Sequence, residues 1–111
     1  MIRVKTYGDR KLFDKIATES KLNYLISRCN IVARRAECIC EVEVHPFYGW
    51  FCADFMTDKF GGIAAMVKFI EKENAWYLND TKVESMEAAL AAVPALIAEL
   101  QATRHIEFRE N

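Results

Sequence analysis

The sequence predicts an α+β domain, in which a mainly antiparallel sheet of about four to six strands packs against two or three helices. Residues 36–57 have the pattern of two adjoining strands joined by a short turn. Apolar residues recur at helical spacing before this stretch and again after Ser85. Helices placed apart from a run of strands are typical of an α+β fold. With 111 residues, 52% of them hydrophobic, the chain is expected to form a single domain, 1–111, around one core.

The first elements are a short strand and one or two helices. Residues 2–7 alternate in a way that predicts a half-buried strand. Asp9 is a helix-capping type of residue, residues 12–17 have helical spacing, and Ser20 can begin a second helix. The apolar stripe of that second helix is Leu22, Leu25, Ile26, Cys29, Val32 and Ala33. Its end stays open, because residues 30–35 are also compatible with an extended chain.

Residues 36–57 are the stretch around which the chain is organised. In its first half, Ala36, Cys38, Cys40, Val42 and Val44 alternate with Glu37, Ile39, Glu41, Glu43 and His45. One face of this strand is therefore apolar and the other mostly acidic. Pro46 and Gly49 predict a turn. Residues 50–57 are apolar at nearly every position, which predicts a central strand buried on both faces.

Two segments after a turn at 58–62 are expected to extend the sheet. Residues 63–74 fit a helix by periodicity or a strand by their close spacing to Trp76, and we favour the strand. Residues 75–78 predict a short strand, followed by a turn at 79–81.

A helix and a strand are expected at the end of the chain. Ser85 can cap the helix, and its buried stripe is Leu90, Val93, Ile97 and Leu100. Pro94 lies inside this pattern and predicts a kink or a break. Residues 103–109 alternate, with Ile106 and Phe108 inward, and predict a final strand.

Charge is distributed unevenly along the chain, although the net charge is only −1. Residues 1–35 carry nine Lys or Arg against three acids, giving +6, and the remaining residues carry −7. We favour mutual neutralisation, because each half is amphipathic and must pack on the other. The alternative is a nucleic-acid-associated protein, in which basic side chains of the N-terminal helices contact phosphates. Those side chains are Lys21, Arg28, Arg34 and Arg35.

The sequence favours a cytoplasmic protein without a membrane partner. Residues 1–7 have no apolar core of a signal peptide. No apolar run approaches the roughly 20 residues that span a bilayer. In the cytoplasm the four cysteines are expected to be reduced.

Cysteine and histidine residues supply the types that form zinc sites, namely Cys38, Cys40, His45 and Cys52. Their spacing does not match common zinc motifs, and His45 points to the face opposite Cys38 and Cys40. We therefore predict core cysteines, no metal and no cofactor. No nucleophile motif accompanies His45 or His105, so no catalytic residue is assigned.

Aromatic residues are concentrated at the central turn, where six of thirteen fall within fourteen residues: Phe47, Tyr48, Trp50, Phe51, Phe55 and Phe60. Phe51 and Phe55 share a strand face and are expected in the core. Aromatic side chains exposed at a turn often anchor a protein interface; the alternative is that the turn folds back onto the sheet. The neighbouring acids Glu37, Glu41 and Glu43 are either a solvated face or a stripe that meets a basic partner.

We therefore predict a small, non-catalytic cytoplasmic protein that acts by binding another protein or by self-association, for example as a homodimer. The predicted surface is Phe47, Tyr48, Trp50, Glu41 and Glu43. In general character, a compact, charge-polarised chain without motifs resembles small accessory or inhibitor proteins, such as those of phages and mobile elements. The first alternative is a nucleic-acid-associated protein, and the second is a small enzyme with an unrecognised pocket.

Overall fold

The fold is a six-stranded sheet with two α-helices, seen in a computed structural model that describes residues 2–57 and 62–110, and side chains up to Thr103. The elements are β1 (Arg3–Thr6), the 3₁₀ helix η1 (Arg10–Leu12), α1 (Ile16–Ala36), β2 (Ile39–His45), β3 (Trp50–Met56), β4 (Ile63–Ile70), β5 (Ala75–Leu78), β6 (Thr81–Val83) and α2 (Met86–Glu110). The strands follow chain order across the sheet, with β1 parallel to β2 and every other pair antiparallel. The predicted α+β fold is confirmed.

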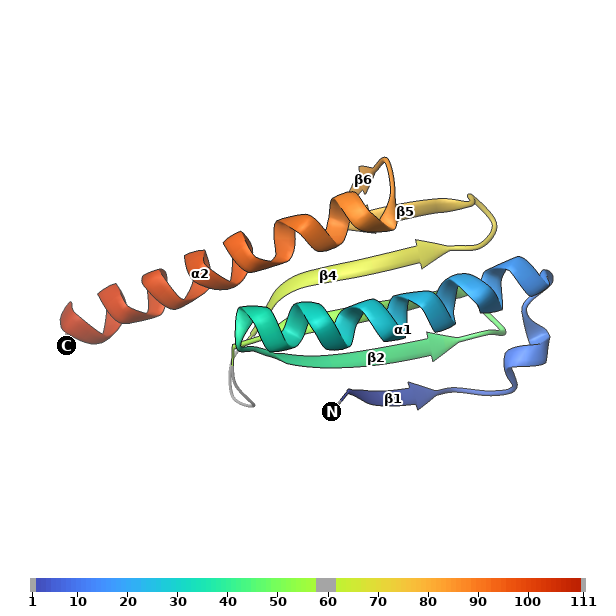
Figure 1. Ribbon diagram of the computed structural model, residues 1–111, viewed down its shortest axis with the longest axis horizontal. Helices are drawn as coiled ribbons and strands as arrows, with labels where there is room; N and C mark the ends of the chain where they lie inside the picture. The colour runs from blue at the N-terminus through green and yellow to red at the C-terminus, as the bar shows by residue number, and fades with distance from the viewer. Residues whose placement is uncertain (1, 58–61, 111) are drawn as a thin grey trace.

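The helices and the sheet form two layers. Helix α1 packs on β2 and β3, α2 packs on β4 and β5, and the two helices contact each other. Figure 1 shows that α2 extends well past the ends of the strands, so its C-terminal part stands clear of the sheet. The core lies between the layers and includes Leu22, Leu25, Val42, Val44, Phe51, Phe55, Val67, Phe69, Val93 and Ile97.

The strand predictions around the central hairpin are confirmed. Along β2, buried residues alternate with half-buried ones, as expected for a strand with one face against the core. Strand β3 lies between β2 and β4 and is buried at five consecutive residues, so it is central and buried on both faces. Residues 63–70 form a strand, as favoured, and β6 is an additional short strand after the turn at Asn79 and Asp80.

The predicted helix start at Ser20 is wrong. Helix α1 begins at Ile16 and continues through Ser20, because the buried side chains of Thr18, Leu22 and Leu25 form one uninterrupted stripe. Asp9 caps η1 instead, where its side chain accepts a 2.9 Å hydrogen bond from the Lys11 N–H. The helix persists to Ala36, which excludes the extended alternative for 30–35 and delays the start of β2 to Ile39.

The predicted final strand at 103–109 is also wrong, because α2 continues to Glu110. Strong helix formers fill the preceding residues 95–102 and carry the helix onward.

No break occurs at Pro94, which lies on the exposed side of α2 while Val93 beside it is buried. The predicted cap is confirmed, since Ser85 Oγ accepts a 3.0 Å hydrogen bond from the Ala88 N–H. The side chains of Ile106 and Phe108, and all of Phe60, lie outside the described residues.

One segment among the described residues is long and apolar enough to span a membrane, in contrast to the expectation from the sequence. It is Met86–Thr103 in α2, with a mean hydropathy of 1.2 and 28% of the segment buried. This is a weak indication by itself, because core helices of soluble proteins have the same composition. Here Leu90, Val93 and Ile97 of the segment belong to the core between helices and sheet.

Candidate functional site

The sheet face opposite the helices carries most of the predicted site. Side chains that alternate with the core residues of β1 to β4 point to this face, on which no described helix lies (Figure 1). We call it the open face, made of Arg3, Lys5, Glu41, Glu43, His45, Trp50, Cys52, Asp54, Met66 and Lys68. Of the predicted surface, Glu41, Glu43 and Trp50 lie on this face.

The acidic row on β2 is bordered by basic side chains rather than standing alone. Glu41 lies opposite Arg3 of β1, with 4.0 Å between a carboxylate oxygen and a guanidinium nitrogen. Glu43 lies opposite Lys5, and its carboxylate is 3.8 Å from His45 Nε2. The Arg3–Glu41 pair joins the basic and the acidic half of the chain, but an exposed pair contributes little to stability. Glu37, the third predicted acid, is not on the strand; it follows α1 in a left-handed conformation.

An aromatic stack holds Trp50 at the edge of the open face. The ring of His45 lies between Tyr7 and Trp50, with ring centroids 4.5 Å and 4.0 Å away. Lys68 Nζ lies 4.4 Å from the centroid of the Trp50 ring, within the range of a cation–π contact. Trp50 is therefore half-buried and held by neighbours from β2 and β4.

The hairpin tip exposes two aromatic side chains. Phe47 is 75% exposed and Tyr48 is 72% exposed, and their rings contact each other edge to face. Gly49 closes the turn with a φ of 73°, and its N–H donates to the Pro46 carbonyl. The alternative in which the turn folds back to close the core does not apply to these two rings. Phe51 and Phe55, by contrast, are fully buried, as expected.

A cavity of about 240 Å³ lies beside the tip, and its residues were not found from the sequence. We call it the tip cavity, lined by Leu12, Asp14, Pro46, Phe47, Tyr48, Gly49, Glu71 and Lys72. Glu71 is only 9% exposed. Its Oε1 accepts a 3.2 Å hydrogen bond from the Asp14 N–H, and its Oε2 is buried without a hydrogen-bond partner in the described part of the chain. The fold thus places a half-satisfied carboxylate next to exposed aromatic rings.

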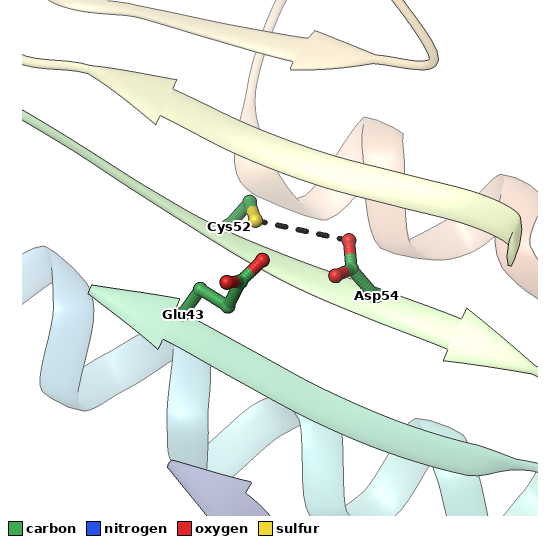
Figure 2. A group of neighbouring side chains, drawn as sticks. All are labelled: Glu43, Cys52 and Asp54. Atoms are coloured by element: carbon green, nitrogen blue, oxygen red, sulfur yellow. Dashed lines mark hydrogen bonds between the residues drawn. The ribbon is translucent and has the colours of Figure 1, made fainter. Parts of the chain in front are cut away.

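A second polar cluster lies in the middle of the open face. Glu43, Cys52 and Asp54 point toward one another from neighbouring strands (Figure 2), and their ligand atoms lie within 4.8 Å of one another. The Cys52 thiol donates to Asp54 Oδ1 across 3.7 Å. Cys52 is 1% exposed and Asp54 is 7% exposed, although no described helix covers them. A thiolate and two carboxylates are residue types that can hold a divalent metal ion.

Burial shifts the pKa values of Cys52 and Asp54. It raises the pKa of Cys52 to about 12, and the charges of Asp54 and Glu43 add to this effect. Burial, followed by the charge of Glu43, also raises the pKa of Asp54 above its ordinary value. Cys52 is therefore a neutral thiol at pH 7, and a metal ion would have to displace its proton to bind.

The cysteine and histidine residues considered as zinc ligands from the sequence do not point to a common centre. Cys40 lies in the core beneath the helices, and its pKa is raised by its hydrogen bond with Cys29 and by burial. Cys52 and His45 lie on the opposite, open face. The prediction that Cys40 is a core cysteine is confirmed, while Cys38 is only half-buried.

The basic side chains of the nucleic-acid alternative do not form one patch. Lys21 Nζ lies 5.3 Å from the centroid of the Phe69 ring, and Arg28 is half-buried. Arg34 and Arg35 are exposed in the last turn of α1. A helix rises about 1.5 Å per residue, so roughly 20 Å of helix separates Lys21 from Arg35. Only Arg34 and Arg35 remain as neighbouring exposed charges among the four.

Comparison of the chain with protein families, with curated proteins and with solved structures gave no match in any of the three.

Proposed function

We propose that this protein binds another protein through its central hairpin. The binding surface comprises Phe47, Tyr48, Trp50, Glu41 and Glu43, and we call it the hairpin surface. The observation that carries the proposal is the exposure of Phe47 and Tyr48 at the tip, 75% and 72%, next to fully buried Phe51 and Phe55. An accessory or inhibitory role in the cytoplasm belongs to the same proposal.

Exposing aromatic rings to water, as the tip does, is costly. Each ring offers a large apolar area, and tyrosine and tryptophan are enriched among the residues that dominate binding energy. The rings at the tip are adjacent and lie on a tight turn, so a partner can cover both without any rearrangement of the sheet. The hairpin surface therefore has the anchors that a protein interface requires.

Charge favours a protein partner over nucleic acid. Residues 46–57 contain no Lys or Arg, and the adjoining strand β2 places Glu41 and Glu43 on the open face. Carboxylates repel phosphates, and stacking of bases on aromatic rings is normally accompanied by basic side chains that follow the backbone. The partner we infer presents an apolar patch to the tip, and on the open face it meets both signs of charge, because Arg3, Lys5 and Lys68 stand beside Glu41 and Glu43.

The test is affinity capture with full-length protein, followed by measurement of the dissociation constant for the partner recovered. Tyr48→Ala should weaken binding by about 2 kcal/mol or more, close to thirtyfold, as expected for an interface hot spot. Tyr24→Ala is the matched control, because Tyr24 is an exposed tyrosine on α1 outside the hairpin surface. Equal binding by both variants would refute the proposal. Sedimentation of the wild type and Tyr48→Ala reports separately whether the partner is a second copy of the chain.

A further inference from the structure

We propose that the tip cavity binds the guanidinium group of an arginine side chain supplied by the partner. This inference rests on the proposed function and names the chemistry by which the hairpin surface selects its partner. It is carried by three features of the cavity: a buried carboxylate with an unsatisfied oxygen, an aromatic wall, and a volume suited to a side-chain head group.

The first feature is Glu71. Its Oε1 is held by the Asp14 N–H, whereas its buried Oε2 has no hydrogen-bond partner among residues 2–57 and 62–103. A buried carboxylate oxygen without a partner is costly, and buried carboxylates are normally paired with a cation or fully hydrogen-bonded. Lys72 also lines the cavity, yet neither Lys72 nor any other described cation lies within ion-pair distance of Glu71. Glu71 therefore has an unfilled hydrogen-bonding position in the lining of the cavity.

The carboxylate can turn toward the cavity without disturbing the fold. The last torsion of a glutamate side chain is broad, so a rotation can bring Oε2 toward the cavity as the hydrogen bond from the Asp14 N–H lengthens. The main chain of Glu71 is fixed, because its N–H donates a 2.8 Å hydrogen bond to the Gly49 carbonyl. Gly49 itself has no side chain to fill the space beside the carboxylate.

The second feature is the wall formed by Phe47 and Tyr48. Their rings contact edge to face with 5.2 Å between centroids, and both are exposed. A cation within about 6 Å of an aromatic centroid is attracted to the ring, and arginine also stacks its planar head on aromatic faces. Asp14 adds a second carboxylate, so the cavity holds two acids against the single base Lys72.

The third feature is size. The cavity volume of about 240 Å³ is below the roughly 300–1,000 Å³ of pockets that enclose drug-sized ligands. A guanidinium head group is much smaller than such ligands and can enter while its backbone remains outside. A planar group with several N–H donors also matches carboxylate geometry better than the compact ammonium of lysine.

The test is a ¹H–¹⁵N NMR titration of the full-length protein with N-acetyl-arginine methylamide. The same titration with the citrulline analogue, a neutral isostere, and with the lysine analogue separates charge from shape. We expect saturable shifts of the amides of Asp14, Gly49, Glu71 and Lys72 with the arginine probe, weaker shifts with lysine and none with citrulline. Equal shifts with citrulline, or no shifts at the tip, would overturn the inference and leave an ordered water as the partner of Glu71.

Variants make the test specific to Glu71. Glu71→Gln keeps the shape of the side chain and should weaken the arginine probe about tenfold or more, the effect of losing a charge-assisted hydrogen bond. Glu73→Gln is the control, because Glu73 is exposed in the same turn and accepts a hydrogen bond from the Tyr77 hydroxyl. If Glu71→Gln does not fold, Phe47→Ala, which alters an exposed ring, tests the aromatic wall instead. Unchanged affinity in the folded variant would overturn the inference.

The partner protein distinguishes this inference from the function on which it rests. If Tyr48→Ala weakens the partner and Glu71→Gln does not, the hairpin surface stands and the guanidinium site fails. If the arginine probe binds at the tip but Tyr48→Ala leaves the partner unaffected, the cavity stands and the proposed protein-binding surface fails.

Discussion

The two faces of the sheet are made by the same strands, yet they differ in what buries them. On the covered face, Val42, Val44, Phe51 and Phe55 are fully buried beneath the helices. On the open face, the residues between them are mostly charged or half-buried. Because the large apolar side chains lie beneath the helices, most of the hydrophobic stabilisation comes from that face. The open face and the hairpin tip are therefore free to carry charged residues and exposed aromatic rings.

The open face nevertheless buries polar groups without help from a helix. Cys52 is 1% exposed and Asp54 is 7% exposed. Both have short side chains on the central strand, and Cys52 lies between the longer side chains of Glu43 and Lys68 on the neighbouring strands. A short side chain in the middle of a sheet is thus covered by its cross-strand neighbours. The contrast between the faces is one of chemistry more than of burial.

The largest expected effect separates the covered face from the hairpin tip. Phe51→Ala or Phe55→Ala should lower the free energy of unfolding by about 3–5 kcal/mol, because each removes a fully buried ring. Phe47→Ala or Tyr48→Ala should lower it by less than about 1 kcal/mol, because those rings are mostly exposed. Urea denaturation of the four variants measures both. A loss at Tyr48 equal to that at Phe51 would mean that the tip supports the core, and the contrast would fail.

A smaller effect concerns Asp54 and has a defined dependence on pH. Burial raises the pKa of Asp54, so the folded protein keeps this proton to a higher pH than the unfolded chain. Stability is then lost as pH rises from the ordinary aspartate pKa, about 4, through the raised value. Asp54→Asn removes this loss, so the stability of the variant relative to wild type should increase as the pH rises above about 4. Urea denaturation across that range gives the trend; a pH-independent difference would contradict it.

The layout of the sheet could be predicted because the alternation of apolar and polar side chains along a strand can be recognised within a short stretch of sequence. Alternation over residues 36–45 placed Val42 and Val44 on one face and Glu41 and Glu43 on the other, as the structure has them. The same signal failed at 103–109, where an alternation of only a few residues follows a strong helix. The predicted helix start at Ser20 was wrong for a related reason. Serine is a helix-capping type of residue, but the buried stripe of α1 continues through this position and keeps it inside the helix.

The site was predictable only where neighbours in sequence are neighbours in space. Phe47, Tyr48 and Trp50 belong to one hairpin, so the sequence located them together. Glu71 was missed because its environment depends on residues far along the chain. The hydrogen bond to Glu71, for example, comes from Asp14, 57 positions away. No pattern near residue 71 reports such a contact, which is why the tip cavity emerged only from the fold.

The smallest expected effect tests whether the contact between Lys68 and the ring of Trp50 on the open face stabilises the fold. Lys68 Nζ lies 4.4 Å from the Trp50 centroid, and a cation–π contact at an exposed site contributes about 0.5–1 kcal/mol. Lys68→Met keeps an unbranched stem of similar length but removes the charge, so the free energy of unfolding should fall by about that amount. Lys82→Met is the control, because Lys82 lies in the same row of the sheet at an exposed position on β6.

A double-mutant cycle decides whether any loss at Lys68 comes from the ring of Trp50. In a Trp50→Leu background, the effect of Lys68→Met should shrink to that of Lys82→Met, because the partner of the cation has been removed. An undiminished effect would assign it to the nearby acids of the open face instead. If the effect does shrink, Trp50 is held in place by Lys68 and His45, whereas Phe47 and Tyr48 are held by little beyond their own turn. The tip is then the less constrained part of the hairpin surface.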